Sequence, residues 1–313
     1  MKAAQINEYG DPSVVVINEV EKPAASEGQV LVEVYASSLN PFDSSVRAGD
    51  VRQYIPLDLP VTLGGDIAGV VVEVSDGVTH VSVGDKVYGQ ASAVVGNSGA
   101  FAEYAITRST QVAKMPSNLD FIDAASLVLV GVSAIQGVTE HINLRSGQKI
   151  LIHGGGGAIG GIAIQIAKHL NAYVATTATG VDLDYVKKLG ADEVVDYKER
   201  DFSAILKDFD AVFDTVGGED FSRSFGILKG GALAVSMAAD PDEAKATELG
   251  ITALHQNSRV TIERLDALGK LIEEGIIKPR VGKVFPLEQT NEAFEARDSG
   301  AVPGKIVLEI KKA

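Results

Sequence analysis

Three glycines at the start of one apolar segment have the type and spacing to hold a phosphate. Gly155, Gly157 and Gly160 form a G-x-G-x-x-G pattern within ILIHGGGGAIGGIAIQIAKHL, residues 150–170. The first glycine permits a tight turn, the second lets a phosphate approach the backbone, and the third lets helix and strand pack closely. An apolar run precedes the glycines and an apolar helix follows, so free N–H groups and the helix dipole would face an anion. The predicted pyrophosphate loop comprises Gly155, Gly157, Ala158, Ile159 and Gly160.

The end of the next predicted strand bears on which dinucleotide binds. An acidic residue about 20 residues beyond the glycines usually binds the ribose 2′-hydroxyl of NAD. In the segment AYVATTATG that position holds Thr177. Without a carboxylate to repel a 2′-phosphate, NADPH becomes acceptable, and Thr177 and Thr179 could donate hydrogen bonds to that phosphate. The missing acid therefore predicts NADPH rather than NADH as the cofactor.

Two observations count against charge pairing with a 2′-phosphate. No Arg or Lys lies between Thr177 and Asp182, and Asp184 adds a second carboxylate nearby. The threonine hydroxyls could instead bond only to backbone groups at the strand end. The sequence leaves both interpretations of the threonines open.

The elements that must position these residues follow a regular alternation of strands and helices. Such alternation implies an α/β fold with a doubly wound parallel sheet. Before it, residues 121–141 are predicted to form an apolar helix pair, and residues 1–120 are rich in β-branched strand runs. The predicted strands of the sheet are residues 149–154, 172–179, 192–197, 211–217 and 232–238.

The change of texture along the chain predicts two domains. Residues 121–274 would form a dinucleotide-binding domain, inserted into a substrate domain made of residues 1–120 and 275–313. A cleft between the two would hold the substrate. Residues 248–256, ELGITALHQ, could form an edge strand that pairs across a twofold axis, so a homodimer is expected.

Composition excludes several kinds of partner and chemistry. The net charge of −14 over 313 residues argues against nucleic acid or an anionic membrane surface as a partner. The chain has no cysteine, which excludes disulfides, thiolate zinc sites and cysteine nucleophiles. No signal peptide and no apolar run of membrane-spanning length are expected, so the cytoplasm is the predicted location.

Several motifs in one order resemble those of a known family. NPFDSSVRAG (residues 40–49), LPVTLGGDIAGVVVEV (59–74) and the glycine segment are similar to those of the zinc-free quinone oxidoreductase, or zeta-crystallin-like, branch of the medium-chain dehydrogenase/reductase superfamily. Ala158 departs from the glycine usual in that family. The resemblance implies a Rossmann domain plus a GroES-like β-rich catalytic domain. It also places Ser45 near the cofactor, and Gly180 and Tyr197 near its adenosine end.

The residues that bind zinc in alcohol dehydrogenases of this superfamily are replaced here. By the resemblance, Asn40 stands where those enzymes have a cysteine, and Gly65, beside Asp66, stands where they have a histidine. The five histidines of the chain show no metal-like spacing. No metal site is therefore expected. Without a Lewis acid to lower the pKa of an alcohol, reduction of a conjugated acceptor is favoured over alcohol oxidation.

The resulting prediction is hydride transfer from NADPH to a small-molecule quinone or enone. Negative charge would grow on the acceptor oxygen, and Asn40 and Tyr54 are the candidate hydrogen-bond donors. Asn40 could instead be a turn residue before Pro41, and Tyr54 an aromatic lid over its loop. Met237 and Ala238 end a predicted parallel strand and are expected near the nicotinamide. Two alternatives are an enoyl-thioester reductase with a tyrosine acid and a non-catalytic NADPH-binding protein.

Overall fold

A parallel six-stranded sheet carries the glycine segment in the computed structural model, which describes residues 1–312. The strands lie in the order β11–β10–β9–β12–β13–β14, and every neighbouring pair is parallel. This is the Rossmann order, in which the direction of winding reverses between β9 and β12. The strands are β9 (Lys149–His153), β10 (Tyr173–Ala178), β11 (Glu193–Asp196), β12 (Phe209–Asp214), β13 (Leu228–Ser236) and β14 (Thr252–His255).

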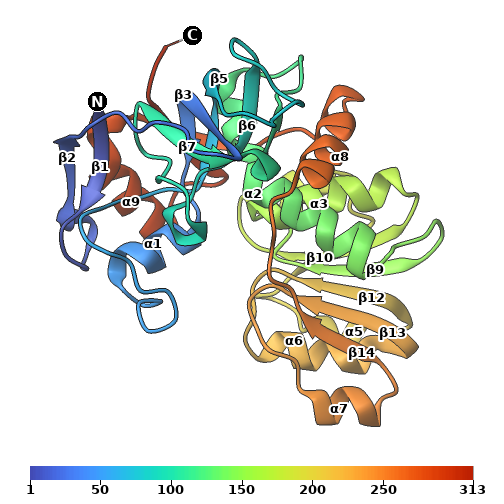
Figure 1. Ribbon diagram of the computed structural model, residues 1–313. Helices are drawn as coiled ribbons and strands as arrows, with labels where there is room; N and C mark the ends of the chain where they lie inside the picture. Colours follow the sequence, from blue (N-terminus) through green and yellow to red (C-terminus); the bar gives the residue numbers. More distant parts are fainter. Residues whose placement is uncertain (313) are drawn as a thin grey trace. The chain divides into compact units, whose positions relative to one another are not determined.

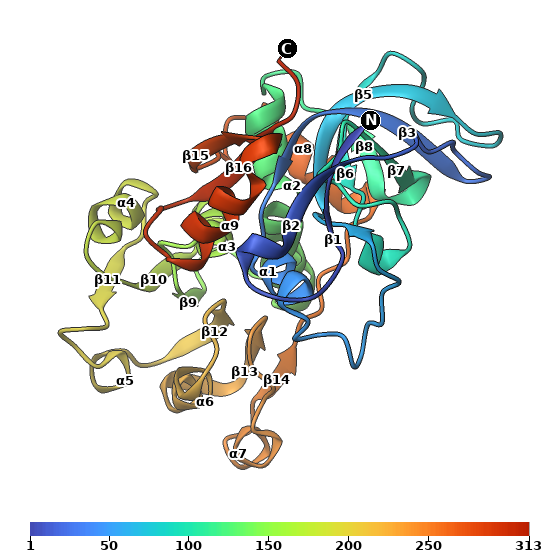
Figure 2. The same cartoon turned by 90° about the vertical axis from the view of Figure 1, so that its left-hand side faces the viewer.

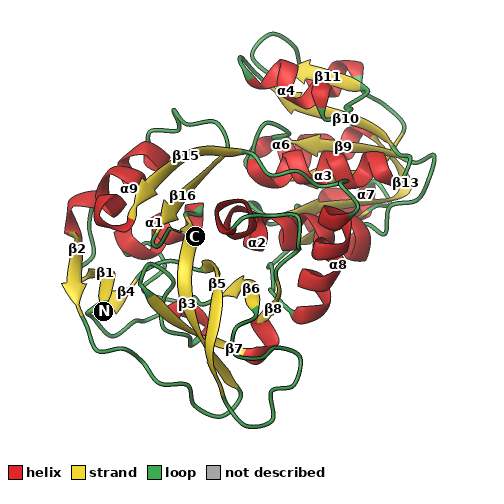
Figure 3. Ribbon diagram, turned by 90° about the horizontal axis from the view of Figure 1, so that it is seen from above, coloured by secondary structure: helices red, strands yellow, loops and turns green. Residues whose placement is uncertain are grey.

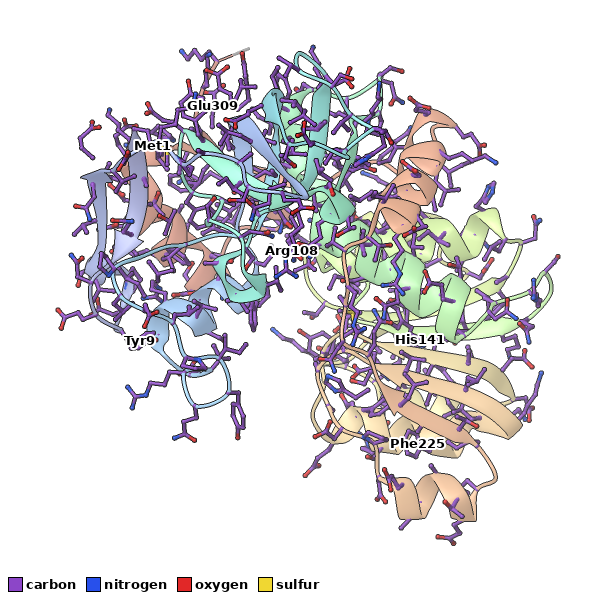
Figure 4. All side chains as sticks on the ribbon, in the orientation of Figure 1. Met1, Tyr9, Arg108, His141, Phe225 and Glu309 are labelled. Atoms are coloured by element: carbon purple, nitrogen blue, oxygen red, sulfur yellow. The ribbon has the colours of Figure 1, made fainter. Side chains whose placement is uncertain are left out.

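Helices cover both faces of this sheet, so the predicted doubly wound arrangement is confirmed. Figure 2 shows α3 and α4 on one face and α5, α6 and α7 on the other. The second face is held by a buried cluster that includes Phe202, Phe221 and Phe225, the last of which is labelled in Figure 4. These helices are α3 (Ala158–His169), α4 (Asp182–Lys188), α5 (Phe202–Ile205), α6 (Glu219–Arg223) and α7 (Glu243–Glu248).

Two further sheets form from the strand-rich ends of the chain (Figure 1). A three-stranded sheet has the order β2–β1–β4. The other has the order β15–β16–β3–β5–β6–β8, with β7 paired to β3. Their strands are β1 (Lys2–Ile6), β2 (Val15–Glu19), β3 (Gln29–Ser38), β4 (Val61–Thr62), β5 (Asp66–Val74), β6 (Lys86–Gln90), β7 (Tyr104–Arg108), β8 (Val112–Lys114), β15 (Val281–Pro286) and β16 (Lys305–Glu309).

Three helices complete this β-rich part, namely α1 (Pro41–Ala48), α8 (Ile262–Glu273) and α9 (Thr290–Asp298). Helices α1 and α9 lie side by side (Figure 3), because Arg47 and Ser44 of α1 bond to the carboxylate of Asp298 at 2.8 and 2.7 Å. A buried core of mainly Val, Ile, Leu, Ala and Phe fills the interior between these elements.

The apolar stretch at residues 121–141 is one helix, not the predicted pair. Helix α2 (Phe121–Ile135) continues without interruption into a π-helical turn, Gln136–His141, whose end is labelled in Figure 4. The wider turn is visible in the bond from the N–H of Ile142 to the carbonyl of Gly137. The stretch contains no proline and no polar turn cluster, so nothing in its sequence ends the first helix.

This helix also corrects the expectation about membrane-spanning length. Phe121–His141 is 21 residues long with a mean hydropathy of 1.8, which is enough to cross a membrane by length and composition. However, 83% of that window is buried within the protein. Burial on this scale is the property of a core helix, which passes the same length and composition test.

The chain groups into two compact units that differ in part from the predicted domains. The first unit comprises residues 1–129, 260–273 and the chain from Pro279 onward; the second comprises residues 130–259 and 274–278. Helix α8, predicted to belong with the dinucleotide domain, groups with the β-rich unit. The reason is visible in two hydrogen bonds, from Tyr88 Oη to the carbonyl of Leu265 and from Asn118 Nδ2 to that of Ile272.

Candidate functional site

The glycine loop has no room for a Cβ at two positions and only tight room at a third. A Cβ on Gly155 would lie 2.2 Å from Thr176 Oγ1, and one on Gly160 would lie 2.2 Å from the carbonyl oxygen of Gly154. Both positions therefore require glycine for the loop and helix to pack on the strands. At Gly157 the nearest atom is that same carbonyl at 3.2 Å, and this residue is the N-cap of α3 with no side-chain cap. The start of the helix thus presents backbone N–H groups without a capping side chain.

A cavity of about 400 Å³ opens beside this loop. Four of the predicted cofactor residues line it: Gly157, Thr177, Thr179 and Tyr197. The remaining loop residues, Gly155, Ala158, Ile159 and Gly160, form the turn and the first turn of α3, and Gly180 follows Thr179 with a φ of 57°. Eight lining residues were not predicted: His153, Gly154, Gly156, Ala178, Asp182, Thr215, Val216 and Asp220.

Thr177 is buried, and its side chain holds the loop rather than reaching out of it. The N–H of Gly154 donates to Thr177 Oγ1 at 3.1 Å, and the N–H of Gly155 donates to the Thr177 carbonyl at 3.1 Å. His153 Nδ1 lies 3.2 Å from the same hydroxyl. This geometry corresponds to the interpretation in which the threonine serves the backbone at the strand end.

The neighbours of His153 define where the hydroxyl hydrogen of Thr177 goes. Ser224 Oγ donates to the carbonyl of Asp220 and lies 2.7 Å from His153 Nε2, so that nitrogen carries the proton. Burial lowers the pKa of His153, although the Asp214 carboxylate opposes the shift, so the imidazole is neutral. Its Nδ1 then accepts from Thr177. The Thr177 hydroxyl is therefore committed and does not supply the hydrogen bond to a 2′-phosphate that we expected from the sequence.

Asp182 reaches the glycine loop from the first turn of α4. A Cβ on Gly156 would lie 2.5 Å from Asp182 Oδ2 and 2.6 Å from its carboxyl carbon. The N–H of Asp182 donates to the carbonyl of Thr179 at 3.2 Å, which fixes the turn between β10 and α4. The other lining acid, Asp220, is paired with Arg223 at 2.7 Å. None of the described residues that line the cavity is Lys or Arg.

Thr215 and Val216 are lining residues that topology could have supplied. They directly follow β12, which pairs with β9 at the point where the strand order reverses, and ligands bind at the carboxyl ends of strands at such a point. Met237 and Ala238, predicted near the nicotinamide, follow the adjacent strand β13. Met237 donates its N–H to the carbonyl of Asp214, but neither residue lines this cavity.

In the β-rich unit, Asn40 lies at the centre of a buried polar network. It is the N-cap of α1 and is 3% exposed. Its Nδ2 donates to Asp66 Oδ2 at 2.8 Å, and its Oδ1 accepts from Lys305 Nζ at 2.6 Å. Ser38 Oγ also donates to Asp66, at 2.8 Å. The amide of Asn40 is therefore fixed between a carboxylate and an ammonium group.

Burial dominates the pKa values in this network. It raises the pKa of Asp66 and lowers that of Lys305, while the mutual attraction of the two groups, 3.7 Å apart, opposes both shifts. Asp43 accepts the N–H of Asn40 at 2.7 Å, and burial raises its pKa to about 7. A set of His, Asp and Glu side chains suited to a metal is not found among residues 1–312.

Ser45 lies in helix α1 of the same unit, and Tyr54 lies after this helix. Tyr54 is in the loop that follows the helix and its side chain is 85% exposed, so it is not packed over that loop. The N–H of Tyr54 donates to the carbonyl of Val51 at 3.0 Å. Ser45 is half-buried, and its carbonyl accepts the N–H of Asp50 at the end of the helix.

Two family models match the chain. The model described as alcohol dehydrogenase GroES-like domain matches residues 26–117, and the model described as zinc-binding dehydrogenase matches residues 189–308. The first match confirms the predicted GroES-like domain. The description of the second model mentions zinc. In this chain, however, Asn40 and Gly65 stand at the two positions where we expected, from the sequence, that the zinc ligands of the superfamily are replaced.

Whole-length relatives point in the same direction. The chain is 34% identical to 2-methylene-furan-3-one reductase of Solanum lycopersicum, covering 98% of this chain and 79% of the relative. It is 32% identical to a chloroplastic NADPH-dependent alkenal/one oxidoreductase of Arabidopsis thaliana, with the same two coverages. Among solved structures, the quinone oxidoreductase of Coxiella burnetii is similar at a TM-score of 0.90, with 33% identity and 99% of each chain covered.

Proposed function

The chain belongs to the quinone oxidoreductase-like branch of the medium-chain dehydrogenase/reductase superfamily, and from this premise we propose that it reduces quinones or other conjugated carbonyls with NADPH. Relatives named as a 2-methylene-furan-3-one reductase, an alkenal/one oxidoreductase and a quinone oxidoreductase cover 98–99% of this chain. The observation that carries the proposal is the glycine loop, which has no room for a Cβ at Gly155 and Gly160 and which lines a cavity at Gly157.

We propose that the loop holds the pyrophosphate of NADPH. The N–H groups at the start of α3 and the positive end of its dipole favour an anion. The phosphates would lie against the loop residues Gly155, Gly157, Ala158, Ile159 and Gly160. A side chain at Gly157 would stand in the cavity and obstruct them. The proposed adenosine end is formed by Thr177, Thr179, Gly180 and Tyr197. The proposed nicotinamide neighbours are Met237 and Ala238, and Ser45 is proposed to lie near the cofactor.

When bound, NADPH supplies the hydride, and this chain's residues supply position and hydrogen bonds. Charge that develops on the acceptor oxygen needs a donor. Tyr54, exposed on its loop, is supported as a donor by the accessibility of its phenol. Asn40 keeps one amide hydrogen beyond its bond to Asp66, and the bond from Lys305 fixes which end of the amide bears it.

We propose that this reduction does not use zinc. The support is chemical: the chain has no cysteine, and an amide and a glycine stand at the positions of Asn40 and Gly65. Asp66 is instead bonded to Asn40, Ser38 and the N–H of Leu129. Activity that survives dialysis against a chelator, and that added zinc does not raise, is the expected result. Loss of activity on chelation with recovery by zinc would contradict it.

Turnover measurements test the main proposal. We expect nicotinamide absorbance to fall when NADPH is mixed with quinones or enones in the presence of the protein. A protein that binds NADPH but oxidises it with none of these acceptors is a binding protein and not this enzyme. The variant Tyr54→Phe distinguishes this proposal from the remaining alternative, an enoyl-thioester reductase with a tyrosine acid. That enzyme would lose nearly all turnover in the variant, whereas quinone reduction would slow only mildly.

Three further proposals concern the roles of the two units, the oligomeric state and the cellular location. We propose that the β-rich unit is the substrate domain and the sheet unit the dinucleotide-binding domain. We also propose a homodimer, supported by the position of β14 at the edge of the six-stranded sheet. A cytoplasmic location is proposed too, supported by the burial of the long apolar helix Phe121–His141. Cell fractionation tests the location.

A further inference from the structure

The cavity beside the glycine loop has a further end that the proposed pyrophosphate site does not use. Thr215, Val216 and Asp220 line it there, in the chain that follows β12. Met237 and Ala238, which follow β13 and are proposed to lie near the nicotinamide, do not line it. The cavity thus extends along the carboxyl ends of β9, β10 and β12, where the adenosine half of a dinucleotide would lie.

Two side chains that line the cavity offer apolar surface to a flat ring. Val216 is 62% exposed and Tyr197 is 55% exposed. Val216 lies against the glycine loop, because a Cβ on Gly154 would be 2.7 Å from its Cγ2. Ligand sites hold a ring between apolar and aromatic side chains, and a few placed polar groups fix its orientation. The valine and the tyrosine ring are therefore suited to the faces of a purine base.

Asp220 adds a hydrogen-bond acceptor to the same end of the cavity. Its Oδ1 accepts from Arg223 Nη1 at 2.7 Å, whereas no described residue donates a hydrogen bond to its Oδ2. The carbonyl of Asp220 accepts from Ser224 Oγ at 2.6 Å, and Ser224 is bonded in turn to His153 Nε2 at 2.7 Å. These bonds hold Asp220 in place beside the end of β9 and leave one carboxylate oxygen for a ligand.

We propose that Asp220 accepts a hydrogen bond from the 6-amino group of the adenine of NADPH, and that this bond makes the protein selective for adenine over hypoxanthine. Val216 and Tyr197 would lie against the faces of the ring, with Asp220 at its amino edge. The inference rests on the proposed function, because it takes the cavity to be the dinucleotide site. It identifies the residue that recognises the base of the cofactor.

The chemistry of the two bases gives the physical reason for the selectivity. Adenine carries an amino group at C6, which donates, whereas hypoxanthine carries a carbonyl oxygen there, which accepts. A carboxylate can only accept, so Asp220 would bond to the first group and repel the second. The neighbouring hydroxyl of Thr215 does not reverse this preference, because it donates its hydrogen to the carbonyl of His153 at 2.8 Å.

Two matched controls separate the proposed contact from effects of charge and of the ion pair. Glu219→Gln removes a carboxylate next to Asp220 on the same helix, at an exposed residue that does not line the cavity. Asp201→Asn removes the other carboxylate that pairs with Arg223, at 2.6 Å, and Asp201 does not line the cavity either. Thermal melts verify that each variant is folded.

The test variants are Asp220→Asn and Asp220→Ser. An asparagine amide can accept from the amino group of adenine or donate to the carbonyl oxygen of hypoxanthine, and a serine hydroxyl can do the same. Either change therefore removes the discrimination between the two bases without requiring that binding be lost. The ratio of two affinities is the readout, so it does not depend on turnover.

The experiment measures the dissociation constants of NADPH and of deamino-NADPH, in which hypoxanthine replaces adenine, for the full chain and each variant. For the natural sequence we expect NADPH to bind about tenfold more tightly than the analogue, as the loss of one hydrogen bond to a charged acceptor implies. Asp220→Asn and Asp220→Ser should reduce this preference to about twofold or less, and both controls should keep it near the natural value.

Three results would overturn the inference. The first is equal affinity of the natural protein for the two dinucleotides. The second is a preference for adenine that Asp220→Asn and Asp220→Ser both leave unchanged. The third is the same loss of preference in either control, which would show an effect of charge or of Arg223. A natural protein that binds neither dinucleotide would instead refute the proposed function, and that result is distinct from all three.

Discussion

At the scale of single residues, the orientation of the Asn40 amide is determined by two partners, one a hydrogen-bond donor and the other an acceptor. Lys305 can only donate and an ionised Asp66 can only accept, so the carbonyl end of the Asn40 amide faces Lys305 and the NH2 end faces Asp66. All three side chains are buried. The network is self-contained within one unit, and each polar group depends on the others because unpaired buried charge is costly.

Removing the buried cation is therefore expected to be severe. Lys305→Met leaves Asp66 without its ion-pair partner and Asn40 without a donor, so we expect a loss of unfolding free energy of about 3–5 kcal/mol. Urea denaturation measures it. The control is Lys311→Met, which breaks the pair with Glu33 at an exposed lysine and should cost much less, because solvent screens that pair. Equal losses in the two variants would contradict the account.

Asp43 gives a pH dependence whose sign follows from its raised pKa. Burial raises the pKa of the folded Asp43 carboxyl from 3.8 to about 7, so the folded protein binds more protons than the unfolded chain between these pH values. Its contribution to stability is full below pH 3.8 and is lost as the pH rises through about 7. At 1.36 kcal/mol per unit, the loss is about 4 kcal/mol at most.

The variant Asp43→Asn isolates this effect, because an amide oxygen still accepts the Asn40 N–H but does not titrate. We expect the stability of Asp43→Asn relative to the natural protein to rise between pH 5 and pH 8, where about half or more of the predicted loss occurs. Melting temperatures measured across this range for both proteins provide the comparison. Parallel pH profiles would show that the Asp43 carboxyl titrates elsewhere.

At the scale of elements, different glycines of the loop serve the packing of helix α3 and the binding of a ligand. Gly160 is held against the Gly154 carbonyl, so its Cβ position concerns how α3 packs on the strands. Gly157 has room for a Cβ with only a small adjustment, but that Cβ would stand at the open start of the helix. Two glycines three residues apart thus have different physical reasons for lacking a side chain.

This difference predicts two distinct outcomes for alanine. Gly160→Ala should lower the free energy of unfolding by about 1–3 kcal/mol and weaken NADPH binding. The reason is that the backbone must move to relieve a contact of 2.2 Å between the new Cβ and the Gly154 carbonyl oxygen. Gly157→Ala should weaken NADPH binding while the melting temperature changes little. Gly226→Ala, where a Cβ meets nothing within 4 Å, is the control and should change neither quantity. Stability unchanged in Gly160→Ala would contradict the packing argument.

At the scale of the whole molecule, the edge of the six-stranded sheet is the feature with a consequence for assembly. Strand β14 pairs with β13 and lies at the end of the strand order, so among residues 1–312 no strand pairs with its other edge. A second copy that pairs β14 with β14 across a twofold axis would cover that edge.

Sedimentation tests the homodimer directly. We expect a mass of twice 32.8 kDa at micromolar concentration. Because the N–H of Gln256 donates to Ser236 of β13, the N–H of Ala253 faces the opposite edge, and an Ala253→Pro variant should shift the protein toward monomer. A matched proline-free change, Ala253→Val, should leave the dimer intact. A natural protein that sediments only as a monomer would remove this proposal.

The sequence by itself determined the architecture and the phosphate loop. Alternating strands and helices specify a parallel sheet, and the spacing of Gly155, Gly157 and Gly160 places close packing and an opening at fixed positions, because both are local properties of the backbone. Strand runs such as residues 66–74 were also correct, since β-branched residues between turn residues favour extended chain. The 121–141 stretch was not, because local periodicity does not show where an apolar helix ends when its surroundings are also apolar.

Only the tertiary structure decided which polar groups meet. Thr177 was correctly placed at the strand end, but its hydroxyl is used by His153, a residue 24 positions earlier. Asp182 and Asp184 are alike in sequence, yet only Asp182 faces the loop, because the turn after β10 orients the first residue of α4 toward Gly156. Lys305 reaches Asn40 across 265 residues. Contacts of this kind depend on how distant segments pack, which spacing along the chain does not encode.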